Sequence, residues 1–395
     1  MSRTLKIKLT KTTMFIIFLL ILVMVKAIAV NAEERPALTI DAKSSILLEP
    51  YTGKILYENN ADQRLAPASV TKVMTMLLIY DALENGAIKW EDTVTISEHA
   101  ASMGGSQIFL EPFEQQTVEA LVKSIVIASA NDAAIAMAEF TSGSEEIFVD
   151  LMNKRAVELG CNNTQFKNAC GLDEDGHYTS ARDMALIAQE MIKKHPEVFE
   201  FTKIWQETIT HKTKRGEEAF GLTNTNKLIK QYDGATGLKT GSTGKALYCL
   251  VGTAEKNEMS LISVVLGSPT PVIRFQEVMK MFDYGYANYK ATAGMESGTE
   301  VGIIKIEKGK TRETAVVVKE KVSALVAKNS SGELENVIRI EENINAPVRE
   351  GDKVGEIIYA FDGAEVGRSD IIVNENIEKA NLGDVFKELT NIWFE

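Results

Sequence analysis

The spacing of hydrophobic and polar residues changes along the chain, and each spacing predicts a different kind of element. Residues 44–59 contain two alternating runs around a Pro-Tyr-Thr-Gly segment, which predicts a β-hairpin. Apolar residues then recur at helical spacing from Val70 to Leu78, which predicts an amphipathic helix. Between 117 and 140 the apolar residues occupy all sides of the helical wheel, so we expect a buried helical region there.

The following stretch mixes helices with strands. Helical periodicity predicts amphipathic helices over 143–160 and 180–194, and the second follows a Thr-Ser pair that is typical of a helix cap. From Thr236 onward the pattern changes to apolar runs typical of paired strands, and a further helix is predicted over 271–289. This order of elements predicts an α/β fold, a mixed sheet with a cluster of helices on one side.

Two segments follow the predicted α/β domain, which we place at 33–290. Residues 291–376 consist of short alternating runs separated by turns, and they predict a small all-β domain, a β-sandwich. Residues 377–395 predict an amphipathic helix with one apolar stripe. Two interpretations of this helix stay open: it packs on the β-domain, or it attaches the protein to a membrane surface. The stripe comprises Leu382, Val385, Phe386, Leu389, Ile392 and Trp393.

The first 32 residues have the three parts of a secretory signal peptide. They begin with a basic stretch, continue with an apolar run from Met14 to Val25, and end with small residues before Glu33. The apolar run is shorter than a good membrane span, so we predict cleavage after Ala32 rather than retention as an anchor. The mature chain is therefore expected outside the cytoplasm, secreted or held at the outer face of the cell membrane.

The composition restricts the classes of partner and cofactor. The formal net charge is −12, and the predicted signal contains five basic residues and no acidic ones, so the mature chain is more acidic still. Nucleic acid is therefore a poor partner. Three cysteines are too few for a disulfide framework. The four histidines form no His-x-x-x-His pair, and the chain has no Cys-x-x-Cys, so we predict neither a metal nor a cofactor.

Three short elements carry the candidate chemistry. Ser69 and Lys72 stand three residues apart at the start of the first predicted helix, where a hydroxyl and an amine lie on one face. Ser129 and Asn131 follow the buried helical run, and Lys239 begins a Lys-Thr-Gly triplet on a predicted strand. A lone Ser-x-x-Lys is weak evidence. The three elements in this order, however, are the combination found in penicillin-binding proteins and class A β-lactamases.

Each of these residues has a role that follows from its chemistry. Ser69 attacks a carbonyl, with its own backbone amide directed at the developing oxyanion. Lys72 is useful as a base only when neutral, a state that burial and the neighbouring charge of Lys239 favour. Ser129 relays a proton to the leaving amine, and Asn131 holds a substrate amide. The strand binds a terminal carboxylate and pairs with an extended peptide. Its contributing side chains are those of Lys239, Thr240 and Ser242.

These motifs make the sequence similar to the serine-type D-alanyl-D-alanine carboxypeptidases of the low-molecular-mass penicillin-binding protein family. The resemblance runs through the mature chain and includes LAPASVTKVMT, IASANDAAIAMAE and TGLKTGSTG. It is closest to the sporulation-associated members, which share SEHAASMGGSQIFLEP and NTNKLIK. The family implies a β-lactamase/transpeptidase-like fold and a peptidoglycan stem pentapeptide as substrate. It also implies removal of the terminal D-alanine through an acyl-serine, and acylation by β-lactam antibiotics.

The resemblance also assigns residues of the site. It implies that Ser69 and Ser242 supply the oxyanion amides, and that Gly241 and Thr243 lie on the substrate-binding strand. Arg274 matches a family arginine expected near the substrate carboxylate, and a salt bridge on the helix surface explains this arginine equally well.

Three positions depart from the pattern of many relatives. Histidine is common in relatives where this chain has Cys170 and Ser242, and some relatives have an arginine where this chain has Thr225. The change at Ser242 costs little, because the oxyanion contact is a backbone N–H. Carboxylate binding is then expected to depend more on Lys239, Thr240 and Arg274. We interpret Cys170 as a buried apolar residue rather than as a thiol at the edge of the site.

Four other functions compete with carboxypeptidase activity. A class A β-lactamase needs a deacylating glutamate in a Glu-x-x-Leu-Asn context, which the sequence lacks, and the extra β-domain also favours the carboxypeptidase. A non-catalytic penicillin-binding sensor would need a coupled signalling module, and a cell-wall adhesion module would leave the three motifs unexplained. A DD-endopeptidase acting on peptidoglycan cross-links is the nearest rival, because the same residues serve both reactions.

Overall fold

The computed structural model describes residues 38–213, 216–292, 295–321, 324–330, 334–361 and 363–384. The chain divides by compactness into Met1–Thr39 and Ile40–Glu395, and the description below concerns the second unit. The predicted signal peptide and most of the predicted C-terminal helix lie outside the described residues. Within the described ranges, no helix combines the length and the apolar character needed to cross a membrane.

A five-stranded antiparallel sheet organises the first part of this unit, in the order β2-β1-β9-β8-β7. The predicted N-terminal hairpin pairs with a strand from more than 200 residues later, since Ser44 lies opposite Leu266. Strand β7 is left at one edge of the sheet. The strands are β1 (Ser44–Leu48), β2 (Ile55–Asn59), β7 (Ala235–Thr243), β8 (Leu247–Lys256) and β9 (Met259–Ser268).

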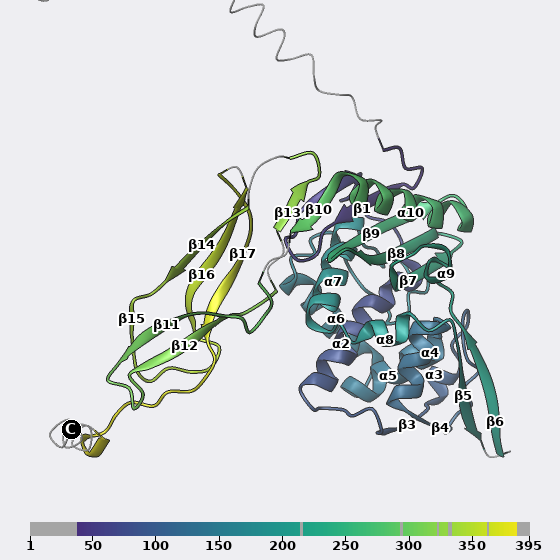
Figure 1. Ribbon diagram of the computed structural model, residues 1–395. Coiled ribbons are helices and arrows are strands. Elements are labelled where there is room, and N and C mark those ends of the chain that lie inside the picture. Colours follow the sequence, from purple (N-terminus) through teal and green to yellow (C-terminus); the bar gives the residue numbers. More distant parts are fainter. Residues whose placement is uncertain are drawn as a thin grey trace, which may run out of the picture. The chain divides into compact units, whose positions relative to one another are not determined.

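Helices cover both faces of this sheet (Figure 1). Helix α10 (Pro271–Asn288) packs on β8 and β9 from one side, while α2 (Lys72–Glu84) and α7 (Ala181–Lys194) pack on the other. Ser180 caps α7, because its hydroxyl accepts the amide N–H of Asp183, as the Thr-Ser pair predicts. The remaining helices are η1 (Ala68–Thr71), α3 (Glu98–Ala101), α4 (Val118–Ile127), α5 (Asn131–Ser142), α6 (Glu145–Glu158), α8 (Val198–Thr202) and α9 (Leu228–Gln231).

The buried helical run breaks into two helices at a point that sequence periodicity does not reveal. Helix α4 ends when the carbonyl of Ser124 accepts the N–H groups of both Ala128 and Ala130. Ser129 then adopts the left-handed conformation, with φ of 62°. Helix α5 restarts at Asn131, whose N–H donates to the carbonyl oxygen of Ser106. The break places Ser129 and Asn131 at the N-terminal end of α5 instead of inside a continuous apolar helix.

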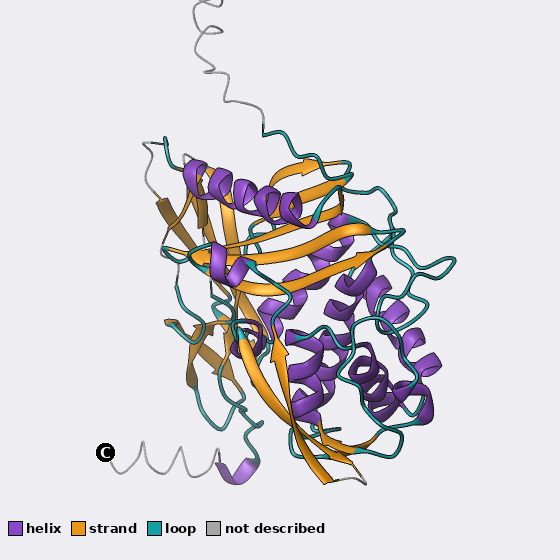
Figure 2. Cartoon of the chain, turned by 90° about the vertical axis from the view of Figure 1, so that its right-hand side faces the viewer, coloured by secondary structure: helices purple, strands orange, loops and turns teal. Residues whose placement is uncertain are grey.

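Two further strand pairs were not predicted from the sequence. Strands β3 (Thr93–Thr95) and β4 (Gln115–Thr117) pair with each other, and so do β5 (Gln206–Thr213) and β6 (Gly216–Thr223). The second pair carries a signal in the sequence, because its inward residues Ile209 and His211 alternate with exposed ones before a glycine-containing turn. Figure 2 shows this long hairpin in front of the helices.

The C-terminal part is all-β, as predicted. Its six-stranded sheet has the order β14-β16-β17-β12-β11-β15, and a separate pair joins β10 to β13. Strands of the six-stranded sheet contribute buried apolar residues to one hydrophobic cluster, among them Ile304, Val316, Ile357 and Ile371. The strands are β10 (Tyr289–Thr292), β11 (Glu300–Glu307), β12 (Glu313–Val318), β13 (Ala324–Ala327), β14 (Leu334–Ile340), β15 (Asn343–Asn345), β16 (Lys353–Phe361) and β17 (Ala364–Val373).

The enclosed position of α2 leads to a stability prediction. Leu77 is fully buried in the cluster of helices, so Leu77→Ala should lower the free energy of unfolding by about 2–5 kcal/mol. Val272 on α10 is 62% exposed, and Val272→Ala should change it by less than about 0.5 kcal/mol. Urea denaturation of both variants measures the difference, and equal stabilities would show that α2 is not enclosed.

Candidate functional site

The first side chains of the site come from the tight turn that leads into α2. Ser69 lies in η1, a 3₁₀ turn, and Lys72 is the first residue of the α-helix. A 3₁₀ turn has three residues per turn, so side chains three apart are eclipsed. The Lys72 Nζ consequently lies 3.2 Å from the Ser69 Oγ. The predicted pairing of hydroxyl and amine is thus present, in a 3₁₀ turn rather than in a regular α-helix.

The amine of Lys72 is fully buried and is held by three hydrogen bonds. Besides Ser69, it donates to the Oδ1 of Asn131 and to the carbonyl oxygen of Cys170, each at 2.6 Å. Burial lowers the pKa of Lys72 to about 8, although the charges of Cys170 and Asp132 oppose this shift. The neutral amine that a general base requires is therefore well populated slightly above neutral pH.

The break between α4 and α5 supplies the second element. Asn131 is almost fully buried, and its Nδ2 donates to the carbonyl oxygen of Gly104 at 2.7 Å. Both ends of its side chain are therefore engaged by protein groups, with Lys72 at the other end. Ser129 is also nearly buried, and none of the three hydrogen bonds of the Lys72 amine goes to it. The network in this state consequently runs through Asn131.

Strand β7 supplies the third element at the edge of the sheet. Its backbone passes against the turn of the serine: a Cβ added to Gly241 would lie 2.9 Å from the backbone nitrogen of Ser69. Only a glycine allows this approach. Thr240 is buried, and its hydroxyl is 2.7 Å from that of Thr225, the position where some relatives have arginine. The exposed Ser242 follows at the end of the strand.

Three basic residues create a concentration of positive charge at this edge. Lys239 is buried and donates to the carbonyl oxygen of Thr240 at 3.1 Å. Burial lowers the pKa of Lys239 well below its ordinary value, and the charges of Lys72 and Arg274 lower it further. A bound anion would relieve this repulsion, so the electrostatics favour a negatively charged group at the end of a ligand.

Arg274 reaches the site from beneath the sheet. It is buried on α10, and its Nη1 donates to the carbonyl oxygens of Gly241 at 3.0 Å and Cys249 at 3.3 Å. The alternative of a salt bridge on the helix surface is therefore wrong, because the guanidinium lies inside the protein. Its contacts hold β7 and β8 together directly behind the serine.

Comparison with known proteins places this arrangement in a family. The family described as D-alanyl-D-alanine carboxypeptidase, Peptidase_S11, matches residues 29–270. The C-terminal domain of penicillin-binding protein 5 matches residues 289–379. The chain belongs to the D-alanyl-D-alanine carboxypeptidase family.

Individual members of the carboxypeptidase family resemble the chain over most of its length. D-alanyl-D-alanine carboxypeptidase DacF of Bacillus subtilis is 45% identical over 89% of this chain and 90% of its own. DacC of Escherichia coli is 34% identical over 87% and 86%. The crystal structure of penicillin binding protein 5 from Haemophilus influenzae has a TM-score of 0.68 and 32% identity, and it covers 86% of this chain and 98% of that one. The predicted family and fold class are confirmed.

A segment that the sequence motifs do not include completes the carboxypeptidase site. The loop formed by residues 168–173 carries the Cys170 carbonyl that binds Lys72. The thiol of Cys170 is buried, and burial raises its pKa, which agrees with our interpretation of this side chain. At the far end of the loop, Asp173 accepts a hydrogen bond from the hydroxyl of Thr243 at 2.7 Å. Thr243 thus joins this loop to β7.

One group of side chains has the spacing of metal ligands among the residues that the structure describes. It comprises Asp81, Glu84 and His195, whose donor atoms lie within 4.8 Å of one another. The amine of Lys194 lies 2.6 Å from Asp81 and 3.0 Å from Glu84, and His195 lies 2.8 Å from Asp81. These carboxylates already pair with basic side chains, so we assign them to a local ion-pair cluster.

The fit of the 168–173 loop against the nucleophile turn generates a second prediction. Gly171 has φ of 89°, and a Cβ there would lie 2.0 Å from the carbonyl oxygen of Ala68. Gly171→Ala should therefore displace the turn that carries Ser69 and lower the rate of its acylation by a fluorescent penicillin at least about tenfold. Gly176→Ala, also at positive φ but facing the flexible Lys167 side chain, is the control and should acylate much faster. Equal rates would contradict the close fit.

Proposed function

We propose that this D-alanyl-D-alanine carboxypeptidase uses Ser69 as its nucleophile and Lys72 as its general base. The observation that carries the proposal is the buried Lys72 amine, 3.2 Å from the Ser69 hydroxyl and with its pKa lowered to about 8. A serine hydroxyl is weakly nucleophilic at its ordinary pKa, and a neutral amine within hydrogen-bond reach activates it.

The reaction divides into acylation and deacylation. The Ser69 oxygen attacks the carbonyl carbon between the two terminal D-alanines of a stem pentapeptide, and its proton passes to Lys72. The tetrahedral oxyanion lies at the backbone N–H groups of Ser69 and Ser242. The amide bond breaks, the departing D-alanine nitrogen takes the proton through Ser129, and an acyl-serine remains. Water then attacks this ester and gives a proton to Lys72, which returns it to the departing Ser69 oxygen, so that the shortened peptide leaves and both residues regain their starting forms.

The positive edge of the sheet gives the substrate its orientation. In our proposal the terminal carboxylate binds at Lys239 and Thr240, and the peptide backbone extends along β7 beside Gly241 and Thr243. Burial, and after it the charges of Lys72 and Arg274, depresses the pKa of Lys239, which supports this assignment because an incoming carboxylate would favour its charged form. We give Arg274 a positioning role, since its guanidinium donates to carbonyl oxygens of β7 and β8. β-Lactams would acylate the same serine.

The cellular setting is also part of the proposal. We propose that residues 1–32 direct export, that 33–290 form the catalytic domain, and that 291–376 form a separate β-domain. The separate hydrophobic clusters of the two parts support this division. The proposed site of action is peptidoglycan at the outer face of the membrane. A role in sporulation follows only from the motifs shared with sporulation-associated members.

The pH dependence of acylation tests the assignment of the base. A group whose pKa is depressed to about 8 gains its active, neutral form as the pH rises through that value. Acylation of wild-type protein by a fluorescent penicillin, followed by stopped flow, should therefore rise across this range. Lys72→Ala should lose this dependence and acylate about 10²–10⁴-fold more slowly. Acylation of Lys72→Ala at the wild-type rate would show that another group activates the serine.

The same preparations distinguish carboxypeptidase from endopeptidase and sensor activity. Release of D-alanine from a diacyl D-Ala-D-Ala peptide, absent in Ser69→Ala, supports the carboxypeptidase. Cleavage of cross-linked dimers without that release would support the endopeptidase. Acylation by penicillin with turnover of neither substrate would support the sensor.

We further propose that the C-terminal segment attaches the enzyme to the membrane surface. Two described residues before it pair with the β-domain: Ala380 donates to the carbonyl of Lys308, and the carbonyl of Glu378 accepts from Lys310. Asn381 then accepts the N–H of Asp384, and Asp384 accepts that of Asn381, a reciprocal cap that supports a helix start. Leu382, the first residue of the predicted stripe, is 91% exposed.

Deletion of residues 382–395 tests this attachment without removing the pairing to the β-domain. The truncated protein should keep its rate of D-alanine release and move from the membrane fraction to the soluble fraction of the producing cells. Full-length Ser69→Ala is the control, and it should stay with the membrane because attachment does not need catalysis. Loss of cooperative unfolding in the truncated protein would show instead that the helix packs on the β-domain.

A further inference from the structure

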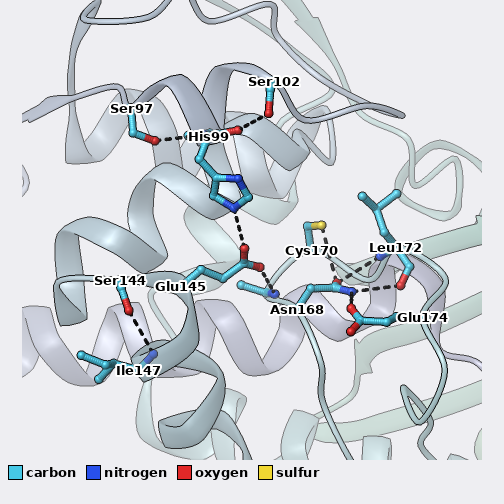
Figure 3. Close-up of polar contacts among 12 residues, drawn as sticks. Ser97, His99, Ser102, Ser144, Glu145, Ile147, Asn168, Cys170, Leu172 and Glu174 are labelled. Carbon is cyan, nitrogen blue, oxygen red and sulfur yellow. Dashed lines mark hydrogen bonds and ion pairs between the residues drawn. The ribbon is translucent and has the colours of Figure 1, made fainter.

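A glutamate behind the active site binds the loop that supplies a hydrogen-bond acceptor to the Lys72 amine. Glu145 is the first residue of α6, directly after the cap residue Ser144 (Figure 3). Its side chain is 15% exposed, and no step of the proposed reaction involves it. A carboxylate is favoured at this place, because the N-terminus of a helix carries partial positive charge. The remaining question is what the carboxylate does there.

Both oxygens of Glu145 have a partner. Oε2 lies 2.9 Å from the Nε2 of His99, which comes from the short helix α3. Oε1 accepts the backbone N–H of Ala169 at 3.0 Å. Figure 3 shows the carboxylate between the imidazole and the 168–173 loop. The contact with His99 restricts the rotation of the carboxylate, so that Oε1 stays directed at the backbone of the loop.

The residue that Glu145 binds is the one directly before the carbonyl that binds Lys72. The N–H of Ala169 goes to Glu145, and its carbonyl accepts the hydroxyl of Thr75 at 2.6 Å. Asn168 closes the loop on the other side, because its Oδ1 accepts the N–H of Gly171 at 2.7 Å. The Cys170 carbonyl and the Gly171 N–H belong to one peptide unit, which Asn168 holds, and Thr75 and Glu145 hold the two peptide units before it, so these three bonds together determine the direction of the carbonyl.

We propose that Glu145 is a positioning residue for catalysis, which fixes the Cys170 carbonyl so that the Lys72 amine is directed at Ser69. This inference rests on the proposed role of Lys72 as the base. Without the carbonyl, the buried amine would keep Asn131 and Ser69 as partners and could rotate between them. A displacement of about 1 Å between reacting groups can cost up to about 10²-fold in rate.

The protonation of Lys72 reports directly on this geometry. Besides burial, the titratable groups that act on the pKa of its amine are the thiol of Cys170 and the carboxylate of Asp132, and the neighbouring Lys239 is electrostatically coupled to it. The charge of Glu145 acts on the thiol of Cys170, so a substitution that keeps this charge tests the position of the acceptor alone. A carbonyl acceptor stabilises the ammonium form, so its withdrawal should lower the pKa of Lys72. The rising part of the acylation profile would then move to lower pH.

Two substitutions separate the position of the oxygen from the charge. Glu145→Gln keeps the length and the acceptor for the Ala169 N–H but removes the charge. Glu145→Asp keeps the charge, which is favourable at a helix N-terminus. Its side chain is one methylene shorter, so the acceptor oxygen is withdrawn from the Ala169 N–H. Glu146→Asp is the matched control, because Glu146 is the exposed neighbour in the same helical turn.

The measurements are the stopped-flow acylation rate across pH and the KM for the D-Ala-D-Ala peptide. We expect Glu145→Asp to acylate about tenfold more slowly, with its pH profile moved to lower pH and KM within about twofold of wild type. KM should stay unchanged because the carboxylate of the substrate binds at β7 in our proposal, and Glu145 does not contact this strand. Glu145→Gln should stay within about threefold of the wild-type rate, and Glu146→Asp should match wild type.

The other outcomes overturn the proposal. If Glu145→Gln is slow and Glu145→Asp is normal, the charge matters and the position of the acceptor does not. If both variants keep the wild-type rate and profile, or if Glu145→Asp loses only thermal stability, Glu145 is a structural residue alone. A wild-type profile with no rise near pH 8 is a separate failure, because it removes Lys72 as the base whatever Glu145 does.

Discussion

The burial of one lysine amine is the constraint around which the active site is built. An ammonium group without solvent is costly unless it is neutralised or well bonded. The Lys72 amine meets this cost with acceptors from three separate segments, the nucleophile turn, the start of α5 and the 168–173 loop. Because these acceptors are far apart in sequence, their convergence requires the helical cluster to be complete.

The same buried amine sets the electrostatic character of the substrate-binding edge. Burial lowers the pKa of Lys239, and the nearby charges of Lys72 and Arg274 lower it further. This accumulation of cations is unfavourable in the free protein and becomes favourable when a carboxylate enters. Binding and base activation therefore share one physical origin, which is the exclusion of water from positive groups behind β7.

The 168–173 loop joins the two halves of the candidate site, the Ser69–Lys72 turn and the edge strand β7. It contacts Lys72 through a carbonyl, passes directly over Ala68 at Gly171, and reaches β7 through the bond between Asp173 and Thr243. The loop has no regular hydrogen-bonding pattern of its own and depends on side-chain acceptors, among them Asn168 and Glu145. Its residues therefore act as a scaffold for the residues in contact with the substrate.

The sequence by itself determined the fold class, the family and the identity of the motif residues. Periodicity identifies helices and strands because it follows from local geometry, and the spacing of Ser69 and Lys72 matches a single turn. It did not reveal the break at Ser129 or the hairpin formed by β5 and β6, whose strands are mostly polar. The contacts of Arg274 and of the Cys170 carbonyl were likewise decided only by the tertiary structure. A backbone carbonyl carries no side-chain signature, and the burial that lowers the pKa of Lys72 results from packing among segments distant in the chain.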